Sequence, residues 1–196
     1  MTDWTRLTEN LEQRGFTVRR FATKEEAADY LDGQIDGVSV AFGGSMTVQE
    51  MGLYPRLAAH NSALWHWNKD GLAQAAATDV YICSLNGLAE TGELINIDGV
   101  GNRVASTIFG HKRVYFVVGR NKIAPDYDQA LWRARNIAAP RNCQRLGLKT
   151  PCAVKADKCY NCSSPERSCR ALVVLWEKPR NEETMEVILI DEELGY

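Results

Sequence analysis

Apolar and polar positions along this chain follow two patterns, one typical of amphipathic helices and one typical of buried strands. Helices are expected at 3–14, at 23–31 (opened by a Thr23–Glu26 capping box), at 47–53, at 102–109 and at 126–147. Strands are expected at 16–22, 37–42, 79–85, 92–97 and 112–120. Because strands alternate with helices over most of the length, the pattern predicts an α/β domain with a mainly parallel sheet.

The C-terminal part of the chain has a different pattern. Two β-rich runs, 170–178 and 185–191, flank a charged turn at 179–184, and we expect them to form a terminal β-hairpin at a sheet edge. An irregular segment that carries cysteines, at about 150–170, precedes them. Since the chain shows neither an internal repeat nor a low-complexity linker, its 196 residues are expected to form a single domain.

Composition and charge narrow the range of partners. Hydrophobic residues make up 45% of the chain and charged residues 24%, and the formal net charge is −2 with both signs interspersed. The sequence has no basic patch or stripe, which argues against a nucleic-acid partner. The sequence lacks an apolar run long enough to span a membrane, and its N-terminal residues lack the apolar core of a signal peptide. We therefore expect a cytoplasmic protein without a nucleic-acid or membrane partner.

The stretch VAFGGSMTVQEMG places glycines and a serine where a buried strand ends and a helix begins. Ligands bind to open α/β sheets at this edge, so Gly43, Gly44 and Ser45 are candidate ligand-binding residues and Glu50 a candidate catalytic carboxylate. The alternative is a tight turn in which Ser45 only caps the helix. The motif is neither a dinucleotide fingerprint nor a P-loop.

A second candidate loop lies in LAETGELINIDGVGNRVAS. Glu90 and Thr91 follow the predicted strand at 79–85, and Asn102 and Arg103 open the next helix. A carboxylate, an amide and a guanidinium that converge in one cleft would bind a small organic acid or a phosphorylated ligand. The alternative is turn chemistry around the Asp98–Gly99 pair, which leaves Arg103 on the surface.

The cysteines are the most informative chemical feature. Cys152, Cys159, Cys162 and Cys169 have the spacing C-x6-C-x2-C-x6-C. Four thiolates suit zinc or an iron–sulfur centre and exclude magnesium and calcium. Free thiols, or a disulfide formed by oxidation, remain the alternatives. Cys83 and Cys143 are expected to be buried core thiols, and Cys143 is also a conceivable fifth participant.

Four segments in order resemble the LUD-domain family, the lactate utilisation proteins, in its cysteine-containing form. They are GGSMTVQEMG, AETGELINIDGVGNRVAS, KRVYFVVGRNKI and PCAVKADKCYNCSSPERSCR. The resemblance covers roughly residues 3–180. It implies the Rossmann-like three-layer sandwich of the glucosamine-phosphate deaminase, ribose-phosphate isomerase and coenzyme A transferase superfamily. Carried over by position, the family motifs fall on Gly43, Gly44, Ser45 and Glu50, on Glu90, Thr91 and Gly92, on Asn102 and Arg103, and on Cys152, Cys159, Cys162 and Cys169.

The resemblance implies a role in the oxidation of lactate to pyruvate together with iron–sulfur or oxidoreductase partner subunits. The four-thiol set and the resemblance together imply a redox accessory component with an iron–sulfur cluster, [4Fe-4S], at the four cysteines. The chain has no flavin motif and no ferredoxin-type cysteine run, so the sequence does not indicate that it oxidises lactate alone. One alternative is an enzyme for a carboxylated or phosphorylated substrate, with Glu50 or Glu90 catalytic and a structural zinc at the cysteines. Another is a binding subunit stapled by zinc. A homo-oligomer is compatible with each.

Overall fold

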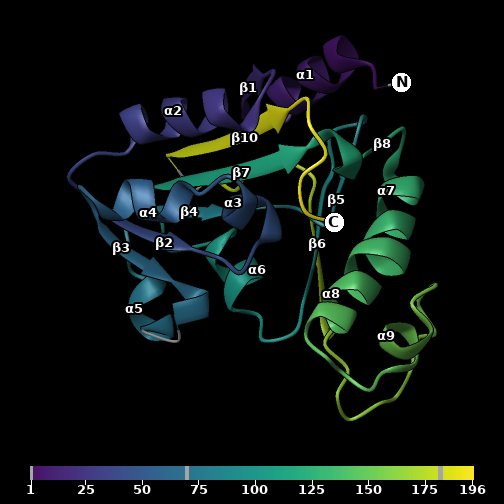
Figure 1. Ribbon diagram of the computed structural model, residues 1–196. Coiled ribbons are helices and arrows are strands. Elements are labelled where there is room, and N and C mark those ends of the chain that lie inside the picture. The colour runs from purple at the N-terminus through teal and green to yellow at the C-terminus, as the bar shows by residue number, and fades with distance from the viewer. Residues whose placement is uncertain (1, 69–70, 181–182) are drawn as a thin grey trace.

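The computed structural model describes residues 2–68, 71–180 and 183–196. Its main sheet has six strands, all parallel to their neighbours. In spatial order these are β1 (Thr17–Phe21), β10 (Thr184–Ile190), β7 (Arg113–Gly119), β4 (Val80–Cys83), β2 (Ser39–Phe42) and β3 (Ser62–Trp65). The predicted α/β fold with a parallel sheet is therefore confirmed (Figure 1).

The main sheet is buried on both faces, and β7 shows how the sequence achieves this. Phe116 and Val118 point into a core that includes Leu7 and Leu11 of α1 (Trp4–Gln13). The alternate side chains of β7, such as Val117, point into the opposite core. That core is covered by α2 (Lys24–Gln34), α3 (Met46–Glu50) and α4 (Leu53–Ala58). A strand covered on both faces needs apolar residues at every position, which explains the run VYFVVG.

A second, mixed sheet packs on the same side of the main sheet as α1. In order, its strands are β8 (Ile123–Ala124), β5 (Gly87–Ala89), β6 (Leu94–Asp98) and β9 (Ala171–Leu175). A long helix lies against its other face, as α7 (Tyr127–Arg133), a π-helical turn (Ala134–Ala138) and α8 (Ala139–Arg145) (Figure 1). This matches the helix predicted at 126–147, and small side chains such as Ala130 and Ala134 let it approach the sheet closely.

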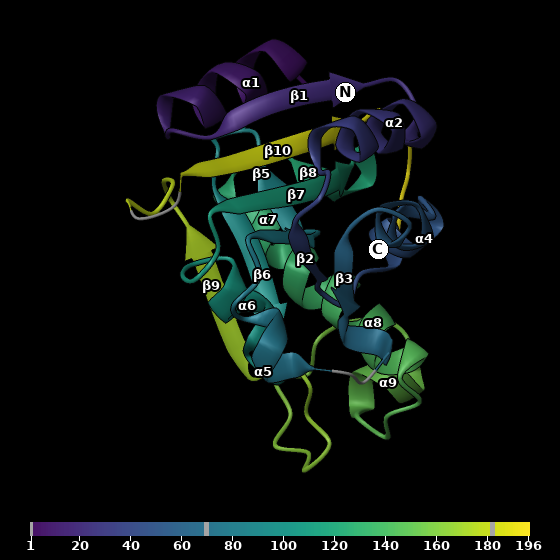
Figure 2. The ribbon, with the colours of Figure 1, turned by 90° about the vertical axis from the view of Figure 1, so that its left-hand side faces the viewer.

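The predicted terminal hairpin is wrong. β9 pairs antiparallel with β6 in the second sheet, whereas β10 lies between β1 and β7 in the main sheet, parallel to both (Figure 2). The physical reason lies in the burial of the two strands. β10 is buried along nearly its whole length, as a central parallel strand must be, while β9 at its sheet edge is mostly half-buried. Residues 181–182 of the predicted turn lie outside the described residues.

Several short elements were not predicted from the sequence. They include β3, β5 and β8, together with α5 (Leu72–Ala75), α9 (Pro151–Lys155) and the 3-10 turns His66–Asn68 and Arg120–Lys122. The short helix expected at 102–109 is present as α6 (Asn102–Ser106). In the described part of the chain, no helix combines the length and apolar character needed to cross a membrane.

Candidate functional site

A cavity of about 270 Å³ opens at the carboxyl ends of the main-sheet strands. The chain leaves β2 to form β3 on one side and then crosses to β4 on the other side, so a crevice forms where the order reverses. The residues that follow these strands line the cavity: Gly44 and Ser45 after β2, His66 and Trp67 after β3, and Ser84 to Asn86 after β4. The edge predicted for a ligand is therefore the edge that is hollowed.

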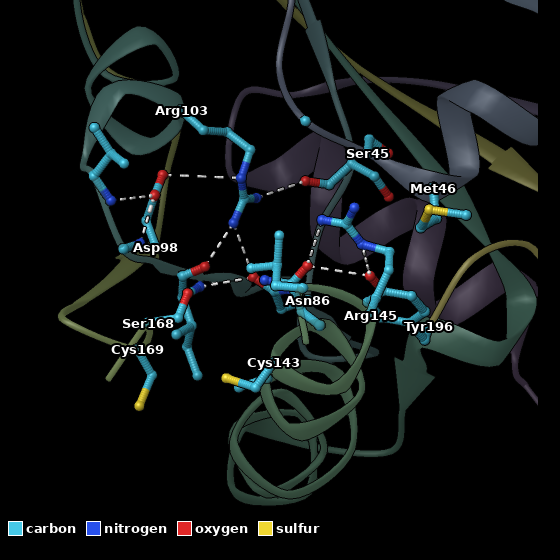
Figure 3. A pocket seen from close by; sticks show the side chains of 18 of the residues that line it. Ser45, Met46, Asn86, Asp98, Arg103, Cys143, Arg145, Ser168, Cys169 and Tyr196 are labelled. Atoms are coloured by element: carbon cyan, nitrogen blue, oxygen red, sulfur yellow. Dashed lines mark hydrogen bonds and ion pairs between the residues drawn. The ribbon is translucent and has the colours of Figure 1, made fainter. Parts of the chain in front are cut away.

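Elements from outside the main sheet form the opposite wall (Figure 3). The end of β6 contributes Asp98, α6 contributes Arg103, and α8 contributes Cys143 and Arg145. Cys169, from the segment that precedes β9, also lines this wall. The last residue, Tyr196, reaches the cavity as well, after the chain beyond β10 has folded back over the sheet edge.

The glycine loop caps a helix and also lines the cavity. Ser45 caps α3, since its Oγ accepts a hydrogen bond from the Val48 N–H at 3.3 Å, and it also lines the cavity. Gly43 lies behind the wall, where a Cβ would be 2.7 Å from the Tyr81 hydroxyl oxygen. Glu50 is the exposed last residue of α3, and its Oε2 accepts a hydrogen bond from the Gly195 N–H at 2.9 Å.

Arg103 acts as a brace inside the wall. Its guanidinium joins the residues after β4 to the end of β6, and most of its donors are already used by protein acceptors. These acceptors are the Ser84 carbonyl at 3.1 Å, the Asn86 Oδ1 at 3.1 Å, the Ile97 carbonyl at 2.6 Å and the Asn96 Oδ1. The surface position that the alternative assigned to Arg103 is not observed, since its side chain is only 12% exposed.

Asp98 organises the loop that leads into α6. Its Oδ1 accepts hydrogen bonds from the N–H groups of Gly99 at 2.6 Å and Gly101 at 3.2 Å, and its Oδ2 from that of Val104 at 3.1 Å. Burial acts to raise the pKa of Asp98. The charge of Arg103 and these N–H groups outweigh burial and hold the pKa below its usual range. Asn102 also lines the cavity, and its amide lies 3.2 Å from His66 Nδ1.

The Glu90–Thr91–Gly92 segment lies elsewhere, against α1, and the expected convergence of this segment with Arg103 in one cleft is not observed. Glu90 Oε1 accepts a hydrogen bond from the Asp3 N–H at 3.1 Å, and the Thr91 carbonyl accepts one from Arg14 Nε at 2.9 Å. The reason is topological. After β4 the chain enters the second sheet through β5, which carries Glu90 away from the edge of the main sheet.

Two basic residues line the cavity although they were not among the residues predicted from the sequence. Lys122 is only 3% exposed and follows β7, and Arg145 lies on α8. Arg145 Nε donates to the Tyr196 hydroxyl at 2.7 Å, and its Cζ lies 5.2 Å from the centre of the Trp67 ring. The carboxyl-end rule applied to the predicted strand 112–120 would have pointed to Lys122. No comparable signal in the sequence marks Arg145 or Tyr196.

A small cluster of buried cysteines forms where α8 meets α9. Cys143 and Cys152 are buried in one small cluster, and Thr150 Oγ1 lies 3.3 Å from Cys152 Sγ. Burial raises the pKa of the Cys143 thiol to about 11, and the nearby Cys152 and Cys169 thiols act in the same direction. Cys143 is thus the buried thiol that was expected, and it also lines the cavity beside Cys169.

Cys159 and Cys162 lie farther along the loop and are half-exposed. The turn between them contains Asn161 with a φ of 45°, and the Asn161 N–H lies 3.3 Å from Cys159 Sγ. Arg167 ties the loop together, because it donates to the carbonyls of Cys162 and Cys169, each at 2.9 Å. Cys159 and Cys169 both line a second cavity of about 280 Å³.

The donor set has the chemistry of an iron–sulfur or zinc site, and either centre requires its thiols to gather around one point. Thiolates are the ligands of both centres, and an N–H group beside Cys159 Sγ is the kind of contact that stabilises a ligating thiolate. Within residues 2–68, 71–180 and 183–196, no three Cys, His, Asp or Glu side chains are placed to hold one metal ion. We therefore assign no step of chemistry to such a group.

Fold and site together define an α/β protein with a parallel sheet and a ligand-sized, cation-lined cavity at the carboxyl ends of its strands. The LUD domain family model matches residues 4–190, so the chain belongs to this family of lactate utilisation proteins.

Comparison with solved structures supports the fold. The chain is similar to a DUF162 family protein from Deinococcus radiodurans, whose crystal structure was determined at 1.70 Å resolution, with a TM-score of 0.56. The two are 12% identical, and the match covers 95% of this chain and 94% of that one. At this identity the likeness shows the fold alone. A search of curated proteins found no match.

Proposed function

We propose that this LUD protein is a redox accessory component of lactate utilisation that binds a small organic acid in the cavity. The observation that carries the proposal is the position of Cys169, which lines both the cation-lined cavity and the second cavity beside Cys159. An acid bound near Lys122 and Arg145 would therefore lie next to the cysteine segment. In this proposal the cysteine segment is the part of the chain that would face oxidoreductase partner subunits in the cytoplasm.

The cofactor in this proposal is an iron–sulfur cluster, [4Fe-4S], held by Cys152, Cys159, Cys162 and Cys169. Such a cluster supplies one-electron transfer when it is bound. The half-exposed loop that carries Cys159 and Cys162 would have to close toward the buried Cys152, and Arg167 would help to order it. Zinc is the alternative occupant, since it takes the same ligands.

Iron and sulfide analysis of protein purified without oxygen tests the cofactor. We expect a brown protein whose iron and sulfide are lost in the Cys159→Ser/Cys162→Ser double variant. Ser163→Ala is the matched control, because it changes the same exposed loop without removing a thiol. A colourless, zinc-loaded protein with full activity would overturn the iron–sulfur assignment.

Calorimetric titration with L-lactate and related small acids tests the cavity. Arg145→Met should weaken binding by about tenfold, since a charge-assisted contact contributes about 1.5 kcal/mol. Arg141→Met removes the same charge from the same helix at a residue that does not line the cavity, and binding should be unchanged. Equal effects of the two variants would argue against binding in the cavity.

A second candidate function is an enzyme that acts on a carboxylated or phosphorylated small molecule, with the cysteines holding a structural zinc. The observation that favours it is Lys122, a buried lysine on the wall of a cavity that Ser84 and Asn86 also line. Glu50 and Glu90 lose support as catalytic groups, because among the described residues neither lines the cavity. Chelation that unfolds the protein without removing iron would favour this alternative.

A further inference from the structure

Lys122 is the most unusual residue of the cavity. It closes the 3-10 turn after β7, is only 3% exposed, and yet belongs to the cavity wall. Its Nζ donates hydrogen bonds to Thr47 Oγ1 at 2.7 Å and to Ser84 Oγ at 2.9 Å. Buried lysines are normally paired with a carboxylate. Within the described part of the chain, Lys122 forms no ion pair with one.

The hydrogen bonds fix the orientation of this nitrogen. The Thr47 hydroxyl donates to the Leu194 carbonyl at 3.2 Å, so its hydrogen is used and its oxygen accepts from Lys122. With Ser84 as the second acceptor, two of the three substituent positions on Nζ are occupied by N–H groups that point at protein oxygens. The remaining position carries a third hydrogen in the ammonium form and a lone pair in the amine form.

The surroundings favour the amine form. Burial, together with the charges of Arg133 and Arg103, lowers the pKa of Lys122 to about 7. Glu50 and Cys83 act in the opposite direction, but Glu50 is exposed and bonded to the Gly195 N–H. At neutral pH the unprotonated fraction of Lys122 is on the order of 1000-fold that of a surface lysine.

We propose that Lys122 is a nucleophile that forms an imine with the carbonyl carbon of a small oxo acid bound in the cavity. The inference rests on the acid-binding part of the proposed function. The lone pair of Nζ attacks the carbonyl carbon and a C–N bond forms. The two amine protons leave with the carbonyl oxygen as water, and a C=N bond remains. No oxidant or reductant is needed, and a desolvated lysine near other cations is an arrangement that activates this residue.

The cavity supplies a complementary group for the acid. Arg145 uses Nε for Tyr196 and Nη2 for Asn142 Oδ1, while Nη1 has no hydrogen-bond partner among the described residues (Figure 3). A guanidinium with a free N–H group in the cavity that Lys122 also lines suits a carboxylate. A volume of about 270 Å³ limits the ligand to a small molecule. Carboxylate and carbonyl recognition together define an oxo acid.

Reductive trapping tests the imine directly on the full-length protein. Pyruvate and glyoxylate are the probes, sodium cyanoborohydride reduces any imine to a stable secondary amine, and peptide mapping by mass spectrometry locates the adduct. We expect the adduct on Lys122 to form about tenfold or more faster than on any other lysine, because its unprotonated fraction is larger. Lys122→Met should abolish that adduct, whereas Lys112→Met, at an exposed lysine paired with Asp79, should leave it unchanged.

The wild-type adduct map does not depend on whether a Lys122 variant folds. Labelling spread evenly over surface lysines, or absent from Lys122, would overturn the imine. A parallel titration with L-lactate, which has no carbonyl group to react, separates the two proposals. If lactate binds and no adduct forms on Lys122, the imine fails and acid binding stands. If neither lactate binding nor an adduct is found, both fail.

Discussion

The carboxylate of Asp98 and the guanidinium of Arg103 face each other at the rim of the cavity, with Oδ2 3.9 Å from Nε. Neither group is free to move, because Asp98 accepts the N–H groups of its own loop and Arg103 reaches back to the Ser84 carbonyl. The pair therefore fixes the position of the loop that follows β6 relative to the end of β4.

We predict that Asp98→Asn destabilises the protein by about 1–3 kcal/mol at pH 7. Both Asp98 oxygens accept backbone N–H groups, so an amide NH2 would face either Val104 or the loop glycines as a second donor. Because the folded-state pKa of Asp98 is depressed, its contribution is present above the unfolded pKa of about 4 and is lost as pH falls through the folded pKa.

Denaturant titration of Asp98→Asn and wild type between pH 7 and pH 3 checks this. The difference in unfolding free energy should shrink toward the acidic end. Asp128→Asn, at an exposed aspartate in the first turn of α7, is the control and should change stability by less than about 0.5 kcal/mol. A loss for Asp98→Asn as small as that of the control would show that the loop does not depend on this carboxylate.

We also predict a pH dependence of stability from Lys122, which is a buried base whose charged form is disfavoured in the folded protein. Its folded-state pKa is lowered to about 7, so the unfolded chain binds this proton more tightly. Stability relative to Lys122→Met should therefore rise with pH above 7, by about 1 kcal/mol per pH unit, until the unfolded lysine also titrates near 10.5. Unfolding free energies at pH 7 and pH 9 measure it, and a constant difference would refute the shift. Lys112→Met should show no such trend in this window, because the pKa of Lys112 is raised.

Local sequence patterns predicted most of the helices and strands. They did not predict which strands pair when the partners lie far apart in the sequence. The run in β7 is apolar at every position because both of its faces are covered, and a single sequence shows this directly. The partners of β9 and β10 depend on contacts far along the chain, such as Asp98 with Ala171 and Ile188 with Val117. Neighbouring β runs look like a hairpin when only local sequence is considered.

The site could be predicted where a residue directly follows a strand that had been identified. Gly44 and Ser45 follow β2 and line the cavity, as the carboxyl-end rule requires. Glu90 was misplaced because the second sheet was not anticipated. Arg145 and Tyr196 come from a helix face and from the chain end, and only tertiary packing brings them to the cavity.

Gly43 is predicted to tolerate no side chain. A Cβ there would be 2.7 Å from the Tyr81 hydroxyl oxygen, 3.1 Å from Cys83 Cβ and 3.2 Å from Arg103 Cδ. Gly43→Ala should therefore cost about 1–3 kcal/mol in unfolding free energy and weaken acid binding, because Arg103 must shift. Gly33→Ala is the control. Gly33 is exposed in α2 with open space around it, so alanine should stabilise the helix by about 0.5–1 kcal/mol. Similar thermal midpoints for the two variants would contradict the close approach at Gly43.

Glu90 is predicted to hold α1 in place and to have no part in ligand binding. Its Oε1 accepts from the Asp3 N–H, and its carbonyl accepts from Asn10 Nδ2 at 2.6 Å, so the carboxylate meets the first turn of the helix. Glu90→Gln places an amide at a side chain that is only 7% exposed, and α1 should exchange its amide hydrogens faster.

Hydrogen exchange followed by mass spectrometry on residues 4–13, with L-lactate titration of the same sample, measures both sides of this prediction. Affinity for the acid should stay within about twofold of wild type, which corresponds to less than about 0.5 kcal/mol. Glu9→Gln, at an exposed position of α1, should change neither quantity. If Glu90→Gln lost lactate binding while α1 exchanged its amide hydrogens as in wild type, the prediction would be contradicted and Glu90 would be a ligand-binding residue.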